Sequence, residues 1–107
     1  IAVGSGGSSF ANSWVDYGGG FPGAAFRKDA FGYVHLKGFI KNGTAVDSTT
    51  MITMPTGYKV GSTRHVAAIG ATAAGHIKLT TSGIAYGGGT GNGWLTLDNI
   101  SYYAETV

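Results

Sequence analysis

Alternation of apolar and polar residues, carried by β-branched side chains, is the feature that most constrains this fold. Val, Ile and Thr number 26 among the 107 residues, against four Leu, one Glu and no Gln. β-Branched side chains favour strands, whereas straight-chain residues favour helices. The alternation has a period of two, and helical spacing is sustained nowhere along the chain. We therefore expect an almost entirely β fold.

Turn signals rich in glycine and proline divide the chain into short segments. About eight or nine strands in a chain of single-domain length predict an antiparallel β-sandwich of jelly-roll type. The 33 large apolar residues are sufficient for a packed core. The expected strands are 13–17, 24–29, 32–41, 46–54, 63–72, 75–81, 83–87, 93–97 and 99–104.

The segment 32–41 shows the alternation most clearly. Val34, Leu36 and Ile40 share one face and are expected in the core. The opposite face carries Tyr33, His35, Lys37 and Phe39. Aromatic and polar groups together favour contact with a neighbouring subunit or a ligand, so we predict an interface at Tyr33, His35 and Phe39.

Residues 1–10 have the composition of a flexible connection. Ile1-Ala2-Val3 precedes a run of Gly and Ser, which is typical of a linker from a longer parent chain. The domain itself is expected at 11–107.

Charge and composition exclude several classes of partner. The net charge is +2 and the seven Lys and Arg are scattered, so no basic patch for nucleic acid is expected. No apolar run approaches the roughly 20 residues of a membrane helix, so we expect no membrane insertion. Charged residues make up 11%, against about 25% in typical domains, which favours a surface covered by further copies of the chain.

Catalytic and metal-binding patterns are weak in this sequence. The three histidines form no metal-ligand spacing, and cysteine is absent, so no metal and no cofactor are expected. Serine, histidine and aspartate are all present, but there is no Gly-x-Ser-x-Gly nucleophile elbow. A single Glu leaves only aspartates for a glycosidase pair. We expect a protein that is not an enzyme.

Five short sequence motifs follow one another along the chain, and their order is informative about the class of protein. They are Trp14 with Tyr17; Phe26 with Lys28-Asp29; Gly-Tyr-Val-His-Leu-Lys-Gly at 32–38; Pro-Thr-Gly-Tyr at 55–58; and Trp-Leu-Thr-Leu-Asp-Asn-Ile-Ser-Tyr at 94–102. Their order and spacing over 12–103 resemble the C-terminal head, or receptor-binding, domain of bacteriophage tail-fibre and receptor-binding proteins. The resemblance implies a homotrimeric β-sandwich at the tip of a virion appendage, outside the cell. It also implies adhesion to a bacterial surface saccharide or protein without catalysis.

Two alternatives stay open. One is a structural knob that trimerises or caps a fibre. The other is a monomeric carbohydrate-binding module.

Two loop regions are the expected ligand sites. Tyr86 and Asn92 lie beside the glycine-rich tract 87–93, where a ring and an amide suit sugar hydroxyls. Trp14, Asp16 and Tyr17 form a second candidate beside 18–20. Both patches have packing as an alternative role, which is favoured for Trp14. Asp98-Asn99 predicts a tight turn with Trp94 packed beneath it.

Overall fold

The computed structural model describes residues 1–104, and all regular elements in that range are β-strands. The expected all-β sandwich is confirmed. Eleven strands replace the expected nine, because β1 was not predicted and the segment 32–41 forms two strands. They are β1 (Ser9–Phe10), β2 (Val15–Asp16), β3 (Ala25–Lys28), β4 (Tyr33–Lys37), β5 (Phe39–Lys41), β6 (Thr50–Thr53), β7 (Arg64–Ile69), β8 (Ala74–Leu79), β9 (Gly83–Gly88), β10 (Leu95–Thr96) and β11 (Ser101–Tyr103).

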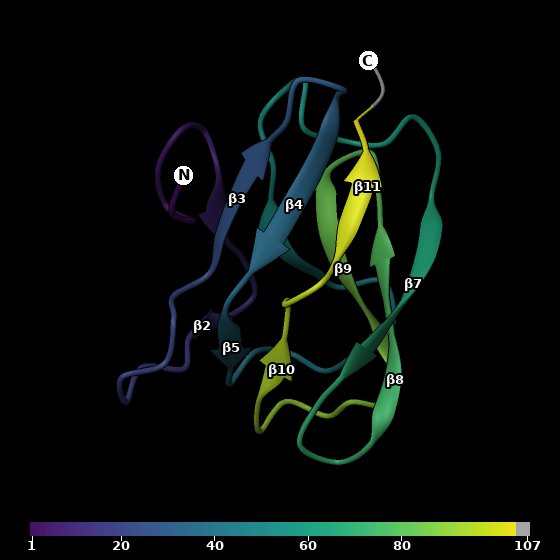
Figure 1. Ribbon diagram of the computed structural model, residues 1–107. Helices are drawn as coiled ribbons and strands as arrows, with labels where there is room; N and C mark the ends of the chain where they lie inside the picture. Colours follow the sequence, from purple (N-terminus) through teal and green to yellow (C-terminus); the bar gives the residue numbers. More distant parts are fainter. Residues whose placement is uncertain (105–107) are drawn as a thin grey trace.

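The strands form two layers, and every pairing is antiparallel. A five-stranded back sheet has the order β1-β6-β9-β8-β7. The front layer consists of two three-stranded sheets, β11-β4-β3 and β10-β5-β2. Figure 1 shows these two sheets one above the other, with β4 leading directly into β5. Among the described residues there is no helix that could cross a membrane.

Gly38 divides the front layer into its two sheets. Its φ is +113°, and a Cβ there would meet the carbonyl oxygen of Gly23 and the backbone of Ala24. Only glycine fits this conformation and this close approach. The Gly38 N–H donates to Asp98 Oδ1 at 3.0 Å, and its carbonyl accepts from the Leu97 N–H at 2.8 Å. The predicted turn at Asp98-Asn99 is present and holds the bend.

The core lies between the two layers. Val34, Leu36 and Ile40 are 0%, 6% and 0% exposed, so the predicted inner face of 32–41 is confirmed. Gly38 is the single residue between β4 and β5, so the alternation of inward and outward side chains continues from one strand into the next. The opposing side chains come mainly from β6, β8 and β9 and include Met51, Ile52, Ile77, Leu79 and Ile84.

Residues 1–10, expected to be a linker, lie against the sandwich. Ala2 bridges to Ala25, and the Val3 N–H donates to the Ala24 carbonyl at 2.9 Å. β1 pairs with β6 at the edge of the back sheet. The last three residues of the expected domain 11–107 lie outside the described residues.

Candidate functional site

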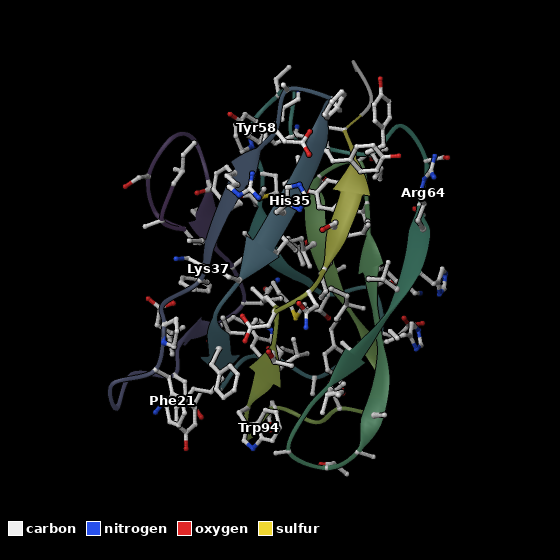
Figure 2. The ribbon with its side chains drawn as sticks, in the orientation of Figure 1. Phe21, His35, Lys37, Tyr58, Arg64 and Trp94 are labelled. Carbon is white, nitrogen blue, oxygen red and sulfur yellow. The ribbon has the colours of Figure 1, made fainter. Side chains whose placement is uncertain are left out.

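The outer face of the front layer carries several exposed or half-exposed rings and charged side chains. Tyr33, His35, Lys37, Phe39 and Lys41 alternate along β4 and β5 and all point away from the core. In Figure 2, His35 lies on the upper sheet, Lys37 near the bend, and Phe21 and Trp94 at the lower end. The face therefore has an aromatic lower part and a polar middle.

Four rings form the lower part, which we name the aromatic platform: Tyr17, Phe21, Phe39 and Trp94. Phe39 is central, with Phe21 stacked at 5.0 Å between ring centroids and Trp94 stacked at 5.5 Å. Tyr17 meets Phe21 edge-on at 5.4 Å and Phe39 at 6.3 Å. Lys41 Nζ lies 4.9 Å from the centre of the Tyr17 ring, a cation–π distance. Rings from three parts of the chain thus make one surface.

Local hydrogen bonds bring Phe21 to the platform. The Tyr17 N–H donates to the Phe39 carbonyl at 3.0 Å, which continues the β2–β5 pairing by one residue. The loop then turns at 18–21, where the Phe21 N–H donates to the Gly18 carbonyl at 3.1 Å. Asp16 Oδ1 accepts from the Ala24 N–H at 2.7 Å and closes the base of the loop. Glycines with positive φ at 18–20 allow the turn.

The platform remains accessible to solvent. Phe21 is 50% exposed, and Tyr17, Phe39 and Trp94 are half-buried. Half-exposed rings leave part of their surface free while their neighbours fix their orientation. Such a surface can stack against an apolar, flat ligand with little cost in side-chain entropy.

A hydrogen-bonded row crosses the upper sheet. His35 on β4 contacts Ser101 Oγ on β11 through Nδ1 at 2.8 Å and Asp29 Oδ2 through Nε2 at 2.9 Å. Asp29 Oδ1 also accepts from the N–H groups of Phe31 and Tyr33, at 2.9 and 3.0 Å. The His35 hydrogen bond, followed by that from the Tyr33 N–H, lowers the pKa of Asp29 below its usual value. Asp29 therefore caps its turn and orients His35.

The Asp29–His35–Ser101 row has the hydrogen-bonding order of a serine triad. Acyl transfer also requires fixed donors aimed at the developing oxyanion. The neighbouring cationic donors are the long, exposed side chains of Arg27 and Lys37. We therefore infer that the role of this hydrogen-bonded row is to orient the His35 ring. Among residues 1–104 there is no group of three His, Cys, Asp or Glu side chains placed to hold a metal.

Trp14 and Tyr86 are core residues, which corrects their expected role in ligand binding. They are 1% and 5% exposed and stack on each other at 6.1 Å between ring centroids. Trp14 packs directly over Gly43, whose missing side chain makes room for the indole. A ring enclosed in this way has no free face for a ligand, so the packing alternative is correct for both.

Asn92 and Asp16 hold loops in place. Asn92 Nδ2 donates to the Gly43 carbonyl at 2.9 Å, and the Asn92 backbone carbonyl accepts from the Asn42 N–H at 2.9 Å. Tyr86 adds a bond from its hydroxyl, which accepts from the Gly91 N–H at 3.0 Å. The tract expected as a surface loop thus begins as part of β9 and is then tied to the end of β5. Asp16 accepts the hydrogen bond from the Ala24 N–H that closes the base of its loop.

Of the expected ligand residues, only Tyr17 belongs to the aromatic platform. The expected interface residues Tyr33, His35 and Phe39 all lie on the outer face of the front layer, and Phe39 is the centre of the platform. Tyr33 is 46% exposed and packs edge-on against Tyr103 at 5.5 Å. Whether a second subunit covers them stays a prediction.

Sequence reasoning missed Phe21 and Trp94. Phe21 stands beside Pro22 in a turn, and its approach to Phe39 depends on a long-range pairing. Trp94 was expected beneath the Asp98-Asn99 turn, but it lies half-exposed on the outer face. Its alternation with buried Leu95 and Leu97 was the available signal.

Comparisons of the chain with protein-family models, with curated proteins and with solved structures gave no match.

Proposed function

We propose that this domain is an adhesion module that binds a bacterial surface saccharide through the aromatic platform, without cleaving it. In this proposal it is the homotrimeric terminal head of a phage tail fibre or related virion appendage. The observation that most directly supports this proposal is the contiguous surface of the aromatic platform, in which Phe39 is stacked between Phe21 and Trp94. The order of sequence motifs over 12–103 is a second, independent support.

The chemistry of sugars suits this surface. A pyranose ring presents C–H groups on its faces and hydroxyl groups at its edges. Aromatic rings bind the apolar faces, while polar groups nearby bind the hydroxyls. Lys41 lies beside Tyr17, and Lys37 lies on the same face two residues before Phe39. The platform offers several rings in a row, which favours an extended polymer over a single small molecule.

Binding without cleavage is supported by the state of the carboxylates. Hydrolysis of a glycosidic bond requires two carboxyl groups that face the bond between them. All four aspartates of the described residues are engaged elsewhere. Asp16 accepts from the Ala24 N–H, Asp29 pairs with His35, Asp47 pairs with Lys78, and Asp98 accepts from the Gly38 N–H.

A trimer is supported by the amount of exposed apolar surface. Large apolar side chains stand out at Val46 (59% exposed), Ile69 (57%) and Tyr103 (52%). Only 11% of the residues are charged. Association would cover part of this surface, and three weak saccharide sites on one head would add by avidity.

The test combines cell binding with solution mass. We expect the purified domain to be a trimer by light scattering and to bind intact bacteria of its host. Phe21→Ala and Trp94→Ala are each expected to lower cell binding at least roughly tenfold, as for central aromatic contacts. Phe31→Ala is the matched control, because this exposed phenylalanine lies outside the platform.

The outcomes separate the alternatives. A trimer that binds no cell and no polysaccharide supports a structural knob. A monomer that binds polysaccharide supports a carbohydrate-binding module. Equal loss in Phe31→Ala and the platform variants would refute the assignment of binding to the platform.

A further inference from the structure

A groove of about 660 Å³ lies on the upper part of the outer face, above the aromatic platform. We name it the cationic groove. Its polar lining consists of Arg27, His35, Lys37, Asn99 and Ser101. The lining comes from β3, β4, β11, the turn before β11 and the N-terminal residues Ile1 and Ala2, so the groove crosses all three strands of the upper sheet.

Strand register fixes the order of these side chains. Arg27, His35 and Ser101 are direct cross-strand partners and form one row. Lys37 lies opposite Ala25 in the next row, so the small alanine leaves space beside the lysine. Phe39 follows two residues later on the same face. The cationic groove is therefore continuous with the aromatic platform.

Two positive charges in the groove have no acidic partner among residues 1–104. Neither Arg27 nor Lys37 is paired with a carboxylate of residues 1–104, and both side chains are exposed. The nearest aspartate, Asp29, is bonded to His35 and to two backbone N–H groups. The remaining aspartates are engaged elsewhere in the fold. Unpaired cations beside hydroxyl and amide groups bind carboxylate or phosphate oxygens.

The groove also supplies neutral hydrogen-bonding groups. Ser101 Oγ is 2.8 Å from His35 Nδ1, and the Asp29 contact on Nε2 fixes the plane of the imidazole ring. Asn99 sits in the turn with a φ of +65° and is exposed. These groups suit the hydroxyls that surround an acidic substituent on a sugar.

We propose that the cationic groove binds a carboxylate or phosphate group of the same saccharide whose neighbouring sugar stacks on the aromatic platform. The ligand is therefore an anionic polymer, such as one built from uronic acid units or from phosphate-linked units. This inference rests on the proposed saccharide-binding function and adds the charge of the ligand. Arg27 and Lys37 bind the anion, and His35, Asn99 and Ser101 bind adjacent hydroxyls.

The experiment measures binding of the purified domain to three immobilised polymers. Polygalacturonate carries carboxylates, poly(glycerol phosphate) carries phosphates, and carboxyl-reduced polygalacturonate is the neutral match of the first. We expect at least one acidic polymer to bind more tightly than the neutral one, and salt to weaken that binding. Which acidic polymer binds distinguishes the carboxylate source from the phosphate source.

Variants test whether the groove carries the preference. Arg27→Gln and Lys37→Gln are each expected to weaken acidic-polymer binding roughly tenfold, from the loss of one charge-assisted hydrogen bond. Binding of the neutral polymer should weaken less, because Gln keeps a hydrogen-bonding group for sugar hydroxyls but carries no charge. Lys59→Gln is the matched control, because it removes the same charge outside the groove. An equal effect of Lys59→Gln would overturn the proposal in favour of non-specific attraction.

The remaining outcomes separate this inference from the proposed function. Equal affinity for acidic and neutral polymers, still sensitive to Phe21→Ala, would overturn the anionic ligand and keep saccharide adhesion. Absence of binding to all three polymers would overturn the anionic ligand. If host cells also fail to bind, the proposed adhesion function is refuted as well. If host cells bind and the binding depends on the aromatic platform, the proposed adhesion function is kept without the anionic ligand.

Discussion

Gly43→Ala tests the placement of Trp14 in the core, on which the correction of the ligand site depends. A Cβ at Gly43 would fall on Cγ, Cδ1 and Cδ2 of the Trp14 ring. The indole cannot move aside freely, because it is 1% exposed and stacked on Tyr86. The backbone of Gly43 is not in the left-handed region, so the effect is one of space alone. Overpacking of this kind costs about 1–3 kcal/mol.

The expected cost lies at the upper end of that range, because the added carbon meets ring atoms rather than a flexible chain end. A loss of about 3 kcal/mol lowers the Tm of a domain this size by at least about 10 °C. Thermal unfolding followed by circular dichroism measures it. Gly88→Ala is the matched control, since its Cβ would have His76 Cε1 as nearest atom at 3.8 Å. Both changes reduce the entropy of the unfolded chain similarly. Equal Tm values for the two variants would refute the packing of Trp14 against Gly43.

Three further predictions concern stability. Trp94→Ala should cost about 2 kcal/mol in urea unfolding, because its half-exposed indole contributes less than the ~3–5 kcal/mol of a buried one; a larger loss would place it in the core. Tyr102 is buried and donates its hydroxyl to the Tyr58 carbonyl at 2.7 Å. Burial raises the pKa of Tyr102 above its usual value, so its contribution is present below about pH 10 and is lost as the pH rises further. Tyr102→Phe should cost about 1 kcal/mol at neutral pH, and its difference from the wild type should shrink in alkali; a constant difference would contradict this. The pKa of Asp29 lies below 3.8 because of its bond to His35 and its backbone contacts. Its contribution is therefore present above pH 3.8 and lost as the pH falls through the lower folded-state pKa. Asp29→Asn should flatten the acid limb of the stability–pH curve, and an unchanged limb would argue against the His35–Asp29 pair.

The alternation of residues predicted the fold class and the inner face of 32–41, because burial on one side of a strand directly imposes a period of two. The split at Gly38 could not be predicted from that pattern. It depends on the close approach of Gly23 and on Asp98, which lies 60 residues away along the chain. β1 was missed because its pairing with β6 is also long-range and its neighbours are Gly and Ser.

The candidate site was only partly predictable for a related reason. An aromatic residue beside a turn serves equally well in a core or on a surface. Trp14 is buried because Gly43 makes room for it, and Phe21 is a surface ring because its loop folds back onto Phe39. Neither contact leaves a local signal. Phe39 was found because alternation places it on the outer face of 32–41, and Tyr17 was found because it lies beside the glycine turn at 18–20.

Tryptophan fluorescence tests the central claim, that the aromatic platform is the saccharide-binding surface, most directly. Trp14 and Trp94 are the only two tryptophans. A Trp14→Phe variant leaves Trp94 as the sole reporter, and Phe can occupy much of the buried site. We expect titration with host surface polysaccharide to change the Trp94 emission in a saturable way, at the same concentrations that saturate binding to the wild type. Saturable binding that leaves the Trp94 emission unchanged would contradict the claim.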